Sequence, residues 1–142
     1  MYMVSACLAG INCKYNGKNN FNPKIKELVI SGKAIPLCPE VLGGMPTPRT
    51  PCEIIKDSQG LLKIISKEGR DFTTEFELGA RKTLNVIKTL GIKKAILQPR
   101  SPSCGFGKIY DGSFSGQLIP GNGITAQLLL ENNIKLLTLE DL

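Results

Sequence analysis

Residues 71–97, DFTTEFELGARKTLNVIKTLGIKKAIL, are the stretch that decides the fold. Apolar side chains recur in it every three or four residues, and this spacing predicts a helix over residues 71–90. Gly91 stands where a residue with left-handed backbone commonly ends a helix. The apolar segment Ala95–Leu97 then predicts a short buried strand. The chain therefore passes here from a long helix directly into a strand of the core.

The same alternation extends to both sides of this stretch. Three further apolar segments predict buried strands, over residues 1–6, 34–37 and 134–138. Shorter helices are expected over residues 23–30 and 124–131. Strands that alternate with helices predict an α/β fold with a mainly parallel sheet of about four to five strands and helices on both faces. We expect a Rossmann-like single domain that covers residues 1–142.

The remaining segments contain the turns and loops. Glu53–Asp57 and Leu61–Lys67 flank Ser58-Gln59-Gly60 and predict a small β-hairpin. Residues 39–51 and 98–123 are rich in proline and glycine, and we expect no regular structure in either. Long irregular stretches in a compact domain are more often functional than idle.

The composition is that of an ordinary globular protein, with 42% hydrophobic and 21% charged residues. No apolar run approaches the ~18–20 residues that span a bilayer, and the first ten residues lack the basic start of a signal peptide. We therefore expect a cytoplasmic protein without membrane contact. The net charge of +6 comes from dispersed side chains, so no specific nucleic-acid binding is expected. The sequence does not indicate an oligomeric state.

The chain has no histidine but has five cysteines. The missing histidine excludes Ser-His-Asp hydrolysis, Cys-His proteolysis and every metal site that needs an imidazole ligand. A metal must then be held by cysteine or carboxylate side chains. An odd number of cysteines in a reducing compartment argues against a disulfide framework and for thiolate chemistry, metal binding or burial.

Three of the cysteines follow three of the predicted strands. Cys7 and Cys38 come directly after the first two strands, and Cys104 lies a few residues after the third. Because ligands bind at the carboxyl ends of parallel strands, these thiols are expected to meet at one edge of the sheet. Three thiolates suit a soft metal or an iron–sulfur cluster, and a [4Fe–4S] cluster held by three leaves one iron open as a Lewis acid. Cys13 and Cys52 remain possible fourth ligands that would close the site.

Other candidate residues lie close to these cysteines in the sequence. Glu40 can act as a general base or can pair with Arg49. Ser101 and Ser103 can donate hydrogen bonds to a ligand or cap the turn that presents Cys104. The further candidates for binding a substrate are two arginines and a glycine pair: Arg49, Arg100, Gly43 and Gly44.

Six short motifs, in this order, resemble the thiouracil desulfurases, a small prokaryotic domain long catalogued as of unknown function. They are VSACLAG (4–10), KYNG (14–17), PLCPEVLGGMPTPR (36–49), SPSCG (101–105), IYDGSFSG (109–116) and GNGITA (121–126). The resemblance runs from residue 4 to about residue 130, which is nearly the whole chain.

The resemblance implies an oxygen-sensitive [4Fe–4S] cluster on Cys7, Cys38 and Cys104. The sulfur of a small thiolated heterocycle would bind the open iron, and Glu40 would act as acid and base while water attacks the carbon that loses sulfur. Ser101 would contact the substrate. The products would be uracil from thiouracil and sulfide released from the cluster, with no net redox change.

Two other interpretations stay open. The thiols can hold zinc or a closed cluster in a non-catalytic regulatory module, with Cys13 or Cys52 as the fourth ligand. Alternatively, Cys104 can carry a persulfide in a metal-free sulfur-transfer enzyme. The substrate is also open, because Gln98 and Arg100 stand where similar sequences often carry a lysine, and a guanidinium group does not deprotonate.

Overall fold

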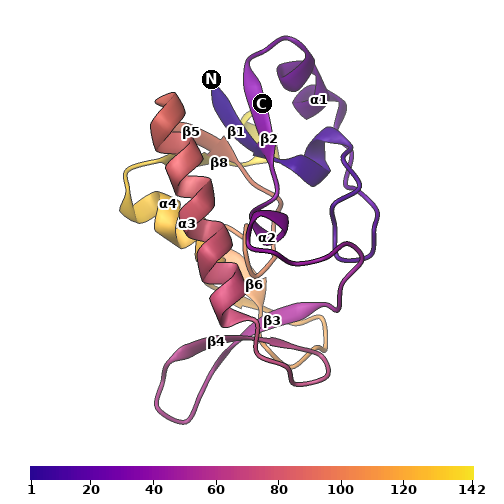
Figure 1. Ribbon diagram of the computed structural model, residues 1–142, viewed down its shortest axis with the longest axis vertical. Helices are drawn as coiled ribbons and strands as arrows, with labels where there is room; N and C mark the ends of the chain where they lie inside the picture. Colours follow the sequence, from indigo (N-terminus) through magenta and orange to yellow (C-terminus); the bar gives the residue numbers. More distant parts are fainter.

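The centre of the fold is a four-stranded parallel sheet, shown by a computed structural model that describes all 142 residues (Figure 1). Its strands are β1 (Tyr2–Ser5), β2 (Ala34–Leu37), β5 (Lys94–Ile96) and β8 (Lys135–Leu137), in the order β2-β1-β5-β8. The central strand β1 pairs with β2 on one side and with β5 on the other. The four strands and their parallel arrangement confirm the prediction from the strand–helix alternation.

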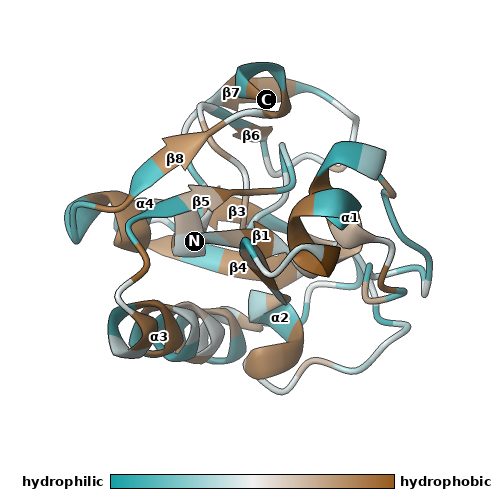
Figure 2. Cartoon of the chain, turned by 90° about the horizontal axis from the view of Figure 1, so that it is seen from above, coloured by the Kyte–Doolittle hydropathy of each residue, from teal (hydrophilic) through white to brown (hydrophobic).

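Helices cover both faces of this sheet, also as predicted. Because successive residues of a strand point to opposite faces, Met3 packs in the core beneath α3 (Thr73–Leu90) and α4 (Ile124–Glu131). Its neighbour Val4 packs against α1 (Pro23–Ile30) on the other face. In Figure 2 both α1 and α3 carry brown and teal stretches, as expected for helices with one buried face.

The ends of the helices follow from particular residues. The side chain of Asn22 accepts a hydrogen bond from the backbone N–H of Lys24 at 2.9 Å, and Pro23 occupies the first turn, so α1 begins there. Gly91 ends α3 with a left-handed φ of 68°, as predicted. The helix starts at Thr73 rather than Asp71, whose carboxylate instead accepts from the Thr73 N–H at 2.8 Å.

The predicted hairpin is present as β3 (Cys52–Lys56) and β4 (Leu62–Ser66). The prediction that residues 98–123 are irregular was wrong, because β6 (Lys108–Tyr110) and β7 (Leu118–Pro120) form a second hairpin there. A distant side chain helps to fix its connecting loop. The Glu53 carboxylate accepts from the N–H groups of Gly112 at 3.0 Å and Phe114 at 3.1 Å.

The prediction for residues 39–51 was also wrong in part, because the short helix α2 (Pro39–Leu42) lies at their start. It rests directly on α3 through two glycines. A Cβ atom on Gly43 would stand 2.0 Å from the carbonyl oxygen of Glu75, and one on Gly79 would stand 1.9 Å from that of Pro39. The two backbones therefore touch at a point where no side chain fits, and this contact fixes the turn that carries Glu40.

Replacing Gly79 by alanine should consequently lower the free energy of unfolding by about 3 kcal/mol, because the added methyl group forces two backbones apart. The Lys82→Ala variant, at an exposed position of the same helix, is the matched control and should change stability little. Urea unfolding of both variants measures the difference. Equal stabilities would show that α2 is free to move away from α3.

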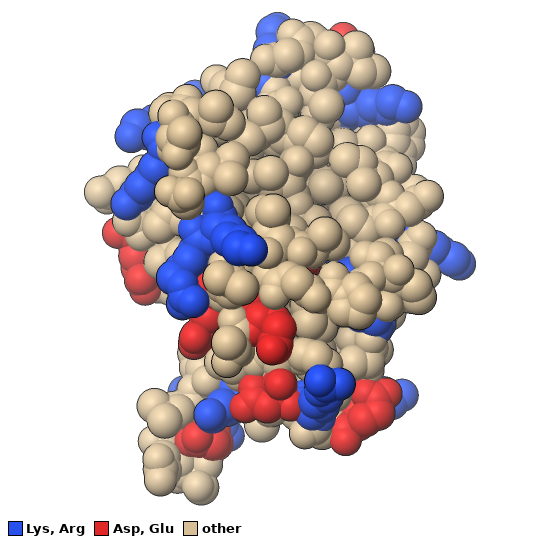
Figure 3. All heavy atoms as spheres, in the orientation of Figure 1, with Lys and Arg blue, Asp and Glu red and all other residues tan.

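No helix of the structure combines the length and the apolar character needed to cross a bilayer. On the face drawn in Figure 3, the Lys and Arg side chains are spread in separate groups. The Asp and Glu side chains are concentrated toward the end of the molecule that carries β3 and β4. This face therefore carries both signs of charge.

Candidate active site

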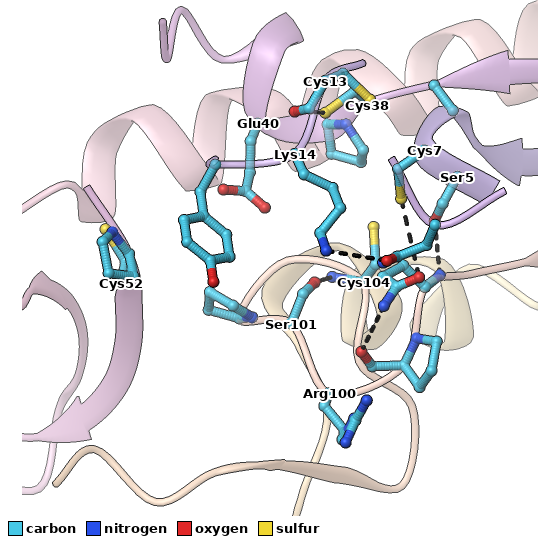
Figure 4. Close-up of a pocket in the computed structure, with 18 of the residues that line it drawn as sticks. Ser5, Cys7, Cys13, Lys14, Cys38, Glu40, Cys52, Arg100, Ser101 and Cys104 are labelled. Atoms are coloured by element: carbon cyan, nitrogen blue, oxygen red, sulfur yellow. Dashed lines mark hydrogen bonds between the residues drawn. The ribbon is translucent and has the colours of Figure 1, made fainter. Parts of the chain in front are cut away.

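A cavity of about 450 Å³ lies at the carboxyl ends of β1, β2 and β5 (Figure 4). Its lining includes Cys7, Cys38 and Cys104, which are separated in the sequence by 31 and 66 positions. Parallel strands bring their carboxyl ends to the same edge, and this topology brings the three cysteines to one cavity. All five cysteines of the chain are free thiols.

Each of the three cysteines is held by local structure. Cys7 lies in a short 3₁₀ helix, Ala6–Ala9, that follows β1 without a break. Cys38 is the residue between β2 and α2, and its thiol donates to the carbonyl oxygen of Cys13 at 3.8 Å. The backbone N–H of Cys104 donates to the Ser101 hydroxyl at 2.7 Å, which closes the turn after β5.

The start of α4 is hydrogen-bonded to the turn that carries Cys104. The N–H of Gly123 donates to the carbonyl of Gly105 at 2.7 Å, and the N–H of Thr125 donates to that of Ser103 at 2.9 Å. A Cβ atom on Gly123 would stand 2.5 Å from the carbonyl oxygen of Ser103, so only glycine allows this approach. The GNGITA motif therefore fixes the backbone on both sides of Cys104.

The two remaining cysteines also line the cavity, but at different places. Cys13 interacts with the thiols of both Cys7 and Cys38, whereas Figure 4 shows Cys52 at the opposite end of the cavity. The Cys38 thiol lowers the pKa of Cys13, but the Cys7 thiol and burial raise it more, to about 11. Burial likewise raises the pKa of Cys104 to about 12. Without a metal, the thiols of Cys13 and Cys104 are therefore protonated at neutral pH.

The donor set fits an iron–sulfur cluster, because cysteine thiolates are the ligands of such clusters. No group of three or more Cys, Asp or Glu side chains in the structure is spaced to hold one metal ion. The thiols of Cys7, Cys38 and Cys104 instead stand around one end of a cavity. A cluster spreads its irons over a larger volume than one ion and binds thiolates in such an arrangement. These three residues, with Cys13 beside them, are the ones that could hold it.

Glu40 points its carboxylate into the same cavity and pairs with Arg49 (Figure 4). The Nε atom of Arg49 donates to Oε1 of Glu40 at 3.1 Å, while Oε2 of Glu40 accepts no hydrogen bond from the protein. Burial raises the pKa of Glu40, and the charge of Arg49 opposes this shift only in part. The ion pair and the role of a base are compatible, because one carboxylate oxygen stays free.

Arg49 also fixes the surrounding loops. Its Nη1 atom donates to the carbonyl oxygen of Pro46 and the hydroxyl of Thr47, both at 3.1 Å. Its Nη2 atom donates to the carbonyl oxygen of Cys13 at 2.8 Å. Four hydrogen bonds to the protein, including the one to Glu40, leave Arg49 little capacity to bind a substrate. The arrangement makes it the group that orients Glu40.

The other predicted residues divide into two groups. Ser101 and Arg100 line the cavity, Arg100 as an exposed side chain with a left-handed φ of 71°. Ser103 is fully buried and shares a hydrogen bond of 2.9 Å with Thr125 instead. Gly43 and Gly44 also lie outside the lining of the cavity, so contact of these three residues with a substrate stays a prediction.

Sequence reasoning gave no role to several polar side chains that line the cavity: Ser5, Lys14, Tyr15, Asn20 and Tyr110. Gln98, noted there only as a departure from similar sequences, lines it as well. Gln98 is tied to the first strand, since its backbone N–H donates to the Ser5 hydroxyl at 2.8 Å and its side chain accepts from the Cys7 thiol at 3.9 Å. Lys14 and Tyr15 belong to the KYNG motif, which was the available signal for them.

Comparisons with known proteins agree with this geometry. A family model described as 2-thiouracil desulfurase matches residues 2–141. The uncharacterized protein YbbK of Bacillus subtilis (strain 168) is 44% identical over 147 residues, which cover 100% of this chain and 97% of that protein. A solved structure of TudS, a [4Fe-4S]-dependent thiouracil desulfidase, has a TM-score of 0.89 and 37% identity, and the match covers 99% of this chain and 91% of that one.

Proposed function

The chain belongs to the 2-thiouracil desulfurase family, and we propose that it removes sulfur from a thiolated pyrimidine such as 2-thiouracil, with the help of a [4Fe–4S] cluster. The observation that carries this proposal is the gathering of Cys7, Cys38 and Cys104 in one cavity with the carboxylate of Glu40. The similarity to the desulfidase TudS over nearly the whole chain supports it.

The three cysteines are the proposed ligands of the cluster. When bound, the cluster supplies an iron without a protein ligand, which acts as a Lewis acid toward the sulfur of the substrate. The buried thiols of Cys7 and Cys104 must lose their protons for this binding, as thiolate ligands do. The 3₁₀ helix after β1 holds Cys7 and the turn closed by Ser101 holds Cys104, without a disulfide or a CxxC pair.

Glu40 is the proposed acid and base. Its free Oε2 atom takes a proton from the water that attacks the carbon bearing sulfur, while Arg49 holds the other oxygen. Burial raises the pKa of Glu40 and so makes it a stronger base than an exposed carboxylate. The proton then passes to the leaving group. Because water replaces sulfide at the carbon, the reaction needs no electron donor.

Ser101 is the proposed contact to the substrate ring. Its oxygen accepts from the Cys104 N–H at 2.7 Å, so its hydroxyl proton remains available for donation into the cavity. The same hydrogen bond places the serine beside a cluster ligand. Ser101 thus both closes the turn and binds the substrate.

The test is anaerobic loading of the protein with iron and sulfide, followed by 2-thiouracil without a reductant. We expect equal amounts of uracil and sulfide. A fully loaded protein that releases no sulfide would remove the substrate claim, and equal sulfide release by metal-free protein would remove the cluster from the reaction.

Cys13 supports a second candidate, a closed cluster in a non-catalytic module, because its thiol contacts those of Cys7 and Cys38. The open-site account predicts that Cys13→Ser keeps the iron content of the wild type and at least about a third of its activity. Cys52→Ser, at the other end of the cavity, is the matched control and should behave in the same way. Loss of iron in Cys13→Ser alone would identify Cys13 as a fourth ligand.

A further inference from the structure

The loop that follows the first cysteine brings an ammonium group into the cavity. Lys14 is fixed by its own backbone, whose N–H donates to the carbonyl of Lys18 at 3.1 Å and whose carbonyl accepts from Gly17 at 2.9 Å. The end of the loop returns to the site, because the N–H of Asn20 donates to the carbonyl of Cys7 at 3.0 Å. The position of Lys14 is therefore tied to that of a proposed cluster ligand.

The ammonium group of Lys14 is only partly engaged by the protein. Its Nζ atom donates to the side-chain oxygen of Asn20 at 2.9 Å. It forms no ion pair, since the two ion pairs of the chain are Arg49–Glu40 and Lys63–Asp71. The Nζ atom also lies 6.0 Å from the centroid of the Tyr15 ring. A lysine has three N–H donors, so the bond to Asn20 leaves donors without a hydrogen-bond acceptor in the protein.

Lys14 differs in this respect from the two arginines that line the cavity. The N–H groups of Arg49 donate hydrogen bonds to Glu40 and to the neighbouring loops. The side chain of Arg100 is exposed. Figure 4 shows the Lys14 side chain extending into the space among Glu40, Ser101 and Cys104. It is thus the half-buried cation with free donors beside the proposed reaction centre.

We propose that Lys14 recognises the substrate by donating a hydrogen bond to an oxygen on its ring. This inference rests on the proposed function and narrows the substrate class to thiolated heterocycles that also carry a ring carbonyl, as 2-thiouracil does. Asn20 is the positioning residue, because it holds Nζ from the side that faces the loop. A hydrogen bond from a charged donor to a ligand is worth about 10- to 100-fold in affinity.

The test compares two ligands in two proteins. In the cluster-loaded Glu40→Gln background, where turnover is expected to stop, the dissociation constants of 2-thiouracil and of 2-thiopyrimidine are measured by anaerobic difference absorption. Lys14→Met should raise the dissociation constant of 2-thiouracil by about 10- to 100-fold. It should change that of 2-thiopyrimidine, which lacks the ring oxygen, by less than about threefold. Lys14→Arg should recover part of the loss.

Lys18→Met is the matched control, because the Lys18 side chain is exposed in the same loop. Only its backbone carbonyl contacts Lys14, and the substitution keeps that carbonyl. It should leave both dissociation constants unchanged. If Lys14→Met weakens the binding of both ligands equally, or of neither, Lys14 does not recognise the ring oxygen. A loss of iron in this variant would also overturn the proposal, because the charge of Lys14 would then stabilise the cluster instead. A wild-type protein that fails to convert 2-thiouracil would overturn the proposed function itself, which separates the two failures.

Discussion

The Cys104→Ser variant should bind almost no iron and should show no detectable desulfidation. Serine does not ionise at neutral pH and therefore cannot replace a thiolate ligand. The fold should survive, because the Ser103 hydroxyl lies 3.9 Å from the Cys104 sulfur and can accept a hydrogen bond from a hydroxyl placed there. Iron content, acid-labile sulfide and visible absorption after anaerobic loading measure the effect.

The control for this variant is Cys52→Ser, which removes a buried thiol from the same cavity. It should keep its iron, since Cys52 lies at the far end from the other cysteines (Figure 4). Wild-type iron content in Cys104→Ser would contradict the proposed ligand set and would move the cluster elsewhere.

The second large effect is expected for Glu40→Gln, which should lower kcat by about 10²- to 10⁴-fold. The amide oxygen can still accept the hydrogen bond from Arg49, so the geometry is kept while the capacity to take a proton is lost. Iron content should not change. Steady-state rates of sulfide release, measured beside iron content, separate the loss of the base from the loss of the cluster.

Glu53→Gln gives a comparison within the same cavity. The Glu53 carboxylate accepts hydrogen bonds from Gly112 and Phe114, and so is occupied in holding the loop between β6 and β7. Its replacement should cost less than about tenfold in kcat. If the two variants lose equal activity, the carboxylates act through structure or charge alone, and Glu40 is not the base.

The central sheet could be predicted because its signals are local. The helical spacing over α3, its end at Gly91 and the four apolar segments are each visible in a few adjacent residues. From this topology the approach of Cys7, Cys38 and Cys104 also followed, because Cys7 and Cys38 directly follow β1 and β2 and Cys104 lies in the loop after β5.

The features that sequence reasoning missed depend on contacts between distant segments. The helix α2 is four residues long and rests on α3 through Gly43 and Gly79, a contact that no local pattern shows. The second hairpin has strands of three residues and a loop that is held by Glu53. In such short elements tertiary contacts outweigh local propensity.

Lys14 was missed for a related reason. In the sequence it is one of 18 basic residues, in a polar loop where a solvated side chain is expected. Its place in the cavity depends on the return of the loop to Cys7 through the N–H of Asn20. Only the folded chain shows that this lysine lines the same cavity as Glu40 and Cys104.

The metal content of protein that is purified and kept without oxygen tests the central claim most directly. We predict about four irons and four acid-labile sulfides per chain, with the broad brown absorption of a [4Fe–4S] cluster. Colourless protein that holds zinc, or that holds no metal after anaerobic loading, would contradict the account, because the cavity would then contain no iron for the substrate sulfur to reach.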